Sequence, residues 1–226
     1  MNSVTAIWQG LDWSILTTAL LSVIPVLLCL TIHEVAHGAA AYALGDDTAK
    51  RLGRLTLNPI RHIDPIGFLM MLLVRFGWAK PVPVDMRNFT RPRAYMALTA
   101  LAGPLSNFLL TTFIFLFQVP LDRLFMSGGV WTYVAEAIFM TGIISVFLGV
   151  FNLLPIPPLD GSKILFALLP EAQHSWLMRY EKYGMILLMA LIFFGFTSGP
   201  LLELVNGLWR WIWDMMSRPS AFLFGG

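Results

Sequence analysis

Charged residues are scarce in this sequence of 226 residues. Asp, Glu, Lys and Arg together make up only 12% of the chain, against 57% hydrophobic residues, and the mean hydropathy is +0.72. A water-soluble domain is closer to a quarter charged. This shortage of charge excludes an ordinary hydrated surface and indicates that lipid is the main solvent of the chain.

The sequence also lacks a pair of cysteines and a strongly basic segment, which bears on disulfides and on nucleic-acid binding. The single cysteine, Cys29, lies in an apolar run, so the chain cannot form an internal disulfide, and we expect this residue to be a small buried hydrophobe. The formal net charge is only +2, and there is no dense basic run with interleaved aromatic residues. The sequence therefore gives no support for a nucleic-acid partner.

Long uncharged runs predict membrane-spanning helices, each of which needs about 20 apolar residues. Four windows qualify: Trp13–Ile32, Ala94–Leu121, Ala137–Leu159 and Tyr183–Leu202. A weaker helix over Leu201–Met216 carries charges among three tryptophans and is predicted to lie at the membrane interface, with a short fifth span as the alternative. We predict one all-α polytopic membrane domain over 1–226, with its core over about 15–195 and about four transmembrane helices, five or six being the alternatives.

The distribution of basic residues predicts which ends of the spans face the cytoplasm. Nine of the fifteen Lys and Arg residues lie between Gly45 and Arg93: Lys50, Arg51, Arg54, Arg61, Arg75, Lys80, Arg87, Arg91 and Arg93. Because positively charged loops stay inside, this segment is predicted to be cytoplasmic and the loop near Asp122 to lie outside. We expect a multi-pass protein of the cell membrane.

The cytoplasmic segment is more than a linker. Ile66–Val74 is an apolar run too short to cross a bilayer, and Arg75–Val84 follows it with Gly77 as a turn point and two prolines that only an edge strand tolerates. This pattern predicts a small β-hairpin or sheet against the cytoplasmic face. A loop that dips into the membrane interface is the alternative.

A metal-binding motif, His33-Glu34-Val35-Ala36-His37, ends the first span. Residues four apart lie on one face of a helix, so both imidazoles can reach one ion, and Glu34 between them can take a proton from a water molecule that zinc activates. The sequence after the motif stays apolar until Gly45, which marks the polar end of the helix. Because a helix rises about 1.5 Å per residue, His37 lies about 12 Å and His33 about 18 Å from that end. Ionisable groups at that depth are costly and need a function.

A catalytic zinc site has three protein ligands and one open position. Among the candidates for the third ligand, His62 and His174 are predicted to lie in loops and Glu136 near the outer end of its span. Asp160 follows the proline-rich inner end of the third span and is therefore predicted to reach the same leaflet as the two histidines. A helix cap or turn residue is the alternative reading of Asp160. A structural turn role is favoured for His62 and Asp64.

The combination of motifs resembles the site-2 proteases, a family of intramembrane zinc metalloproteases. The resemblance rests on His33–His37 followed by Asn152…Pro-Leu-Asp160-Gly161, and on Gly103-Pro-Leu-Ser-Asn107 and Leu57–Gly67 between them. It implies that His33, His37 and Asp160 bind one Zn²⁺ per chain and that Glu34 is the general base. The chain has no room for an inserted PDZ domain and is similar to the compact members.

The resemblance implies zinc-dependent cleavage of membrane-protein substrates within their transmembrane segments, with the active site toward the cytoplasm. Asn107 is a candidate for contacting the substrate or its oxyanion, and hydrogen bonding between helices is its alternative. A membrane metal-ion transporter or binding protein is the alternative function, because it too would hold histidines and carboxylates at depth. The expected partners are the substrate and the lipid bilayer, and the sequence does not determine an oligomeric state.

Overall fold

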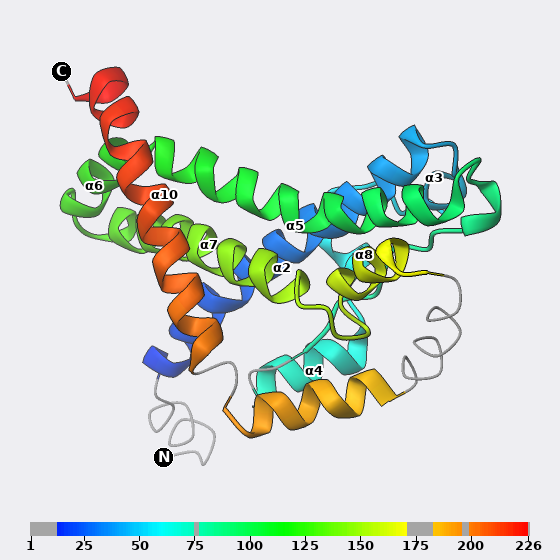
Figure 1. Cartoon of the computed structure of the whole chain (residues 1–226). Helices are drawn as coiled ribbons and strands as arrows, with labels where there is room; N and C mark the ends of the chain where they lie inside the picture. The colour runs from blue at the N-terminus through cyan, green and yellow to red at the C-terminus, as the bar shows by residue number, and fades with distance from the viewer. Residues whose placement is uncertain (1–12, 75–76, 171–182, 196–198, 226) are drawn as a thin grey trace, which may run out of the picture.

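Three long helices form the centre of the fold, which is drawn in Figure 1 from a computed structural model. The structure describes residues 13–74, 77–170, 183–195 and 199–225. Helices α2 (Trp13–Ala43), α5 (Pro92–Leu116) and α7 (Val130–Asn152) pack against one another, and α5 runs antiparallel to the other two (Figure 1). The end of α2, the start of α5 and the end of α7 therefore lie at the same end of the bundle.

The first three predicted spans are confirmed, but with different ends: α2 continues beyond Ile32 to Ala43, and α7 lies seven residues earlier than the predicted window Ala137–Leu159. Val23–Ala43, Pro92–Leu116 and Val130–Asn152 are long and apolar enough to cross a membrane. The second span ends earlier than predicted, because the chain turns after α5 and continues as the separate helix α6 (Gln118–Met126).

The prediction of a fourth long span is not confirmed over the described residues. There, its region contains a shorter apolar helix, Tyr183–Phe193. This helix ends at a turn in which Gly195 has a φ of 82°, a left-handed conformation that suits the residue after a helix. The next helix begins at Pro200, so the predicted window Tyr183–Leu202 does not form one continuous helix.

Helix α10 (Pro200–Phe224) occupies and extends the region predicted as an interfacial helix. It crosses α5 and α7 at a steep angle near the end of the bundle where α6 lies (Figure 1). Its inner face buries Leu201, Val205 and Ile212 in the main hydrophobic core, whereas Trp211 on its outer face is 60% exposed. Among the described residues, α10 is not one of the helices long and apolar enough to cross a membrane, and its placement at the interface stays a prediction.

The prediction of a β-hairpin or sheet is wrong for the described residues. They form no strand, and one isolated bridge between Ile63 and Ala79 is the β-pairing present. The apolar run instead forms helix α4 (Pro65–Val74). Two carbonyls of the following extended segment, those of Lys80 and Pro81, accept hydrogen bonds from the Arg54 guanidinium rather than from a neighbouring strand.

Short elements complete the part of the fold that connects the end of α2 to the start of α5 and follows the end of α7. They are α3 (Thr48–Arg51), η1 (Pro59–His62), η2 (Met86–Asn88) and α8 (Asp160–Leu168). Asp64 accepts hydrogen bonds from the backbone of Ile66 and Gly67 at the start of α4, and His62 donates from Nε2 to the Thr56 carbonyl. These contacts agree with the structural roles expected for both residues.

The buried carboxylate of Asp46 joins two distant parts of this region. It accepts hydrogen bonds from Thr48 in its own loop, and from the Asp85 backbone and the Asn88 amide across the fold. Burial raises the pKa of Asp46, but these hydrogen bonds outweigh that effect and hold the pKa below the usual value of 3.8. Asp46 therefore fixes the segment that precedes α5 against the end of α2.

Replacing Asp46 with Ala should destabilise the protein by about 1–3 kcal/mol, because several partly buried donors lose a charged acceptor. Thermal unfolding in detergent measures this loss. The deficit should shrink as the pH falls below about 3.8, since a group with a lowered folded-state pKa contributes stability that acid removes. Asp47→Ala is the matched control, because its ion pair with Arg51 is exposed and should contribute little. Equal destabilisation by both variants would contradict this role.

Candidate metal centre

Helix α2 brings His33 and His37 to one face, as the four-residue spacing requires. Their ring centroids lie 4.5 Å apart, and the two residues are 4% and 8% exposed. The opposite wall is Gly103 on α5, where a methyl group would lie 2.5 Å from ring atoms of His37 and 2.6 Å from a ring atom of His33. The absence of a side chain at Gly103 therefore makes room for both imidazoles.

Asp160 arrives from a different part of the chain, at the first turn of α8. After α7 ends at Asn152, the chain folds back in a tight loop whose backbone passes close to Gly161. A methyl group at Gly161 would lie 2.2 Å from the Leu153 carbonyl oxygen, so only glycine permits this approach. The loop places the buried Asp160 carboxylate directly below the two histidines.

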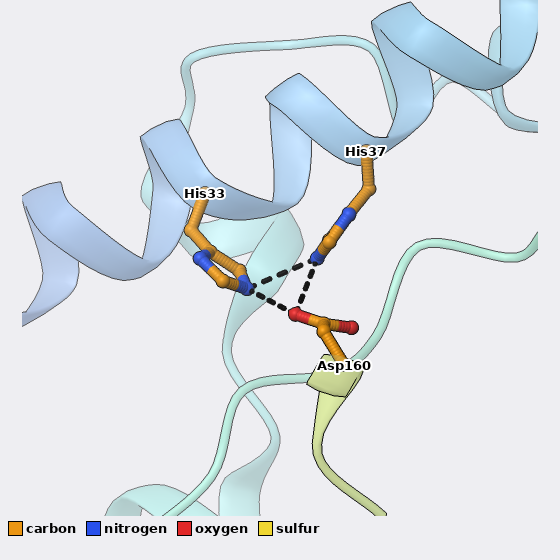
Figure 2. Close-up of side chains that lie close together, drawn as sticks. All are labelled: His33, His37 and Asp160. Atoms are coloured by element: carbon orange, nitrogen blue, oxygen red, sulfur yellow. Dashed lines mark hydrogen bonds and ion pairs between the residues drawn. The ribbon is translucent and has the colours of Figure 1, made fainter. Parts of the chain in front are cut away.

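The three side chains point toward one another, as Figure 2 shows. His33 Nε2, His37 Nε2 and Asp160 Oδ2 form a triangle in which each pair of atoms is 3.0 Å apart. This is the one group of potential metal-ligating His, Cys, Asp and Glu side chains found among the described residues.

Hydrogen bonds on the far side of each ring determine which nitrogen faces the triangle. His37 Nδ1 lies 2.7 Å from the Thr99 carbonyl, which can only accept, so Nδ1 carries the proton and neutral His37 presents a lone pair at Nε2. His33 Nδ1 lies 3.1 Å from the side-chain amide of Asn107, whose Oδ1 has no hydrogen-bond partner. If the amide of Asn107 is flipped by 180°, Oδ1 accepts a hydrogen bond from His33 Nδ1–H. His33 then has a free lone pair at Nε2.

The donor set fits a zinc ion. Two imidazole nitrogens and one carboxylate oxygen are typical zinc ligands, and three ligands of a tetrahedral zinc lie about 3.3 Å apart because each bond is about 2.0–2.1 Å long. The observed separations of 3.0 Å are close to this value. Three electron-rich atoms this close in a buried site repel one another unless a cation or proton lies among them.

A cavity of about 140 Å³ opens beside the triangle. Glu34 lines it together with the three candidate ligands, and the Glu34 carboxylate lies outside the triangle, where Oε2 accepts a hydrogen bond of 2.7 Å from the Val82 backbone. Lys163 and the extended segment containing Val82 and Val84 form other parts of the wall. The site thus combines a metal-binding triangle, a carboxylate and space for water or a peptide.

The structure brings together His33, His37 and Asp160, and it places Glu34 beside them. Asn107 is fully buried behind His33 and does not line the cavity. His62 is not part of the triangle, and His174 lies outside the described residues.

The sequence did not predict three groups that contact the site residues: the Thr99 carbonyl, the Val82 N–H and Lys163. The two backbone groups leave no signal in residue type. Lys163 did leave one, since it stands three residues after Asp160 and therefore lies on the same face of a helix.

Comparisons with known proteins agree with this geometry. Peptidase family M50 matches residues 123–195, which include Asp160. YwhC of Bacillus subtilis, assigned by name to the zinc metalloproteases, is 39% identical over 193 residues, covering 81% of this chain and 85% of the relative. Rip2 of Mycolicibacterium smegmatis, assigned by name to the same class, is 29% identical over 212 residues, covering 88% and 75%. No solved structure matches the chain.

Replacing Gly103 with Ala should abolish binding of a divalent metal, because the added methyl group collides with both imidazoles. The metal content of the purified protein, measured by elemental analysis, tests this expectation. Gly207→Ala on α10 is the control, since a methyl group there meets nothing within 4 Å. Unchanged metal content in Gly103→Ala would show that the histidines do not occupy the positions described.

Proposed function

Because the chain belongs to peptidase family M50, the site-2 protease family, we propose that it cuts membrane-protein substrates within or beside their transmembrane segments. The chain is a zinc metalloprotease and an integral membrane protein. The observation that carries the proposal is the buried triangle of His33, His37 and Asp160 beside a cavity, within a bundle of apolar helices.

His33, His37 and Asp160 would hold one zinc ion in this site. Zinc, when bound, supplies a Lewis acid that lowers the pKa of water to about 7 and polarises a peptide carbonyl. The buried surroundings keep the three ligands in fixed positions, and the Thr99 carbonyl fixes the tautomer of His37. Contacts of this kind to the outer nitrogen of a ligating histidine set its orientation and basicity.

Glu34 is assigned as the general base. Its Oε2 atom is oriented by the Val82 N–H, whereas Oε1 has no hydrogen-bond partner among the described residues. A carboxylate held by one oxygen with the other free can accept a proton at Oε1 and later return it to the leaving amine. Its place in the cavity, outside the triangle, suits proton transfer better than metal ligation.

Asn107 is assigned to orienting His33 rather than to contacting the substrate. Its side chain is fully buried, is absent from the cavity wall and contacts His33 Nδ1. An amide oxygen at this position would keep the proton on Nδ1, so that Nε2 remains available as a ligand.

The active site is proposed to face the cytoplasm. The metal-binding end of α2 leads directly into the segment that contains nine of the fifteen Lys and Arg residues, and this segment returns to the start of α5 at the same end of the bundle (Figure 1). Positively charged segments of this kind are retained on the inner side of the membrane.

The extended segment beside the cavity is proposed to pair with an unwound stretch of substrate. Most of its backbone groups are already used: Lys80 N–H bonds to the His62 carbonyl, and Val82 N–H bonds to Glu34. Within the described residues, the N–H of Val84 has no hydrogen-bond partner, and Val84 lines the cavity. Strand addition at Val84 would present an extended peptide to the metal centre.

Family membership favours a protease over the alternative of a metal-ion transporter. A transport path also requires further polar groups across the bilayer. The triangle is the one group of potential metal ligands found among the described residues.

Glu34→Gln should retain one zinc per chain and lower the rate of cleavage by about 10²–10⁴-fold, because the variant removes the proton acceptor and leaves the ligands in place. Cleavage of a single-span test substrate by the purified protein in detergent, with and without a chelator, provides the rate. Glu203→Gln, at an exposed position on α10, is the matched control and should behave as the wild type. Full activity of Glu34→Gln would refute the assignment of the base.

Val84→Pro should weaken cleavage by about fivefold while the zinc content stays unchanged, since the loss of one N–H costs a hydrogen bond of about 1 kcal/mol to the substrate. Val84→Ala keeps the N–H and should cleave at a rate close to that of the wild type. Comparing kcat/KM of the two variants on the same substrate isolates the backbone group. Equal rates for both would exclude strand addition at this position.

A further inference from the structure

The two oxygens of the Asp160 carboxylate have different surroundings. Oδ2 faces the Nε2 atoms of His33 and His37 at 3.0 Å. Oδ1 points to the ammonium group of Lys163, at 3.4 Å. Asp160 is 5% exposed, so this ion pair lies at the edge of a buried site, where water screens it less than on an open surface.

Lys163 is well placed to keep this arrangement. It stands one turn after Asp160 on α8, with both side chains on the same face, and it lines the cavity beside Glu34. Of the described residues that line this cavity, Lys163 is the one Lys or Arg. Its side chain is 38% exposed, so the ammonium group keeps contact with water while it holds Oδ1.

We propose that Lys163 is a positioning residue that restricts Asp160 to ligation through one oxygen. The inference rests on the proposed zinc site. A carboxylate can bind a metal through one or both oxygens, and binding through both would fill the position that a catalytic zinc leaves open. With Oδ1 held by Lys163, the two histidines and Oδ2 would hold the ion through three protein atoms and would leave it able to bind water or a substrate carbonyl.

Cobalt(II) substitution tests this role without relying on activity, because metal geometry is visible in the absorption spectrum of cobalt and four-coordinate sites absorb more strongly than five-coordinate sites. The full-length protein is purified, stripped of metal with a chelator and loaded with cobalt. The wild type should show strong visible absorption. Lys163→Met should show clearly weaker absorption, because Oδ1 becomes free to join the ion, and Lys163→Arg should restore the wild-type spectrum.

Lys50→Met is the matched control, since Lys50 is exposed and bonds to the Tyr42 hydroxyl away from the site. Melting temperature and metal content confirm that each variant is folded and loaded, and Lys163→Gln serves as a second variant if Lys163→Met does not fold. A Lys163→Met spectrum identical to that of the wild type overturns the positioning role, even if cleavage falls. Failure of the folded wild type to bind cobalt or zinc would instead overturn the proposed metal site.

Discussion

The close approach of three electron-rich atoms is the interaction on which this structure depends. His33, His37 and Asp160 place two imidazole nitrogens and one carboxylate oxygen within 3.0 Å of one another in a buried site. Such atoms repel each other without a cation, so the surrounding fold must hold them together. Gly103 leaves space for the two imidazole rings, and Gly161 leaves space for the backbone of the loop after α7. The two glycines are therefore as important to the site as the three ligands.

The arrangement of the helices follows from the same requirement. The antiparallel α5 places its small residues against the motif on α2, and the parallel α7 delivers α8 to the same end of the bundle (Figure 1). Polar side chains on these helices form hydrogen bonds within the bundle. For example, the hydroxyls of Thr111 and Ser145 both donate to the Asn107 carbonyl. A low-dielectric interior makes each of these contacts costly to lose, so they keep the helices in register around the site.

Local pattern predicted much of the fold and failed where tertiary contacts decide. The uncharged runs correctly located α2, α5 and α7, because apolar length is a property of the sequence itself. The β-hairpin was wrong, because the carbonyls of Lys80 and Pro81 are satisfied by the distant side chain of Arg54. The fourth span was predicted too long, because hydropathy does not record that Gly195 turns the chain.

The sequence by itself determined the type of solvent, the helical class and the pair of histidines, since each depends on composition or on a spacing of a few residues. It also nominated Asp160, because the alternation of the spans brings that residue to the inner end. Only the tertiary structure decided that Asn107 lies behind His33, that Val82 holds Glu34 and that Lys163 holds the second oxygen of Asp160. Contacts such as Asn107–His33 and Val82–Glu34 join segments far apart in the chain, and their geometry depends on how whole helices pack, which no local pattern contains.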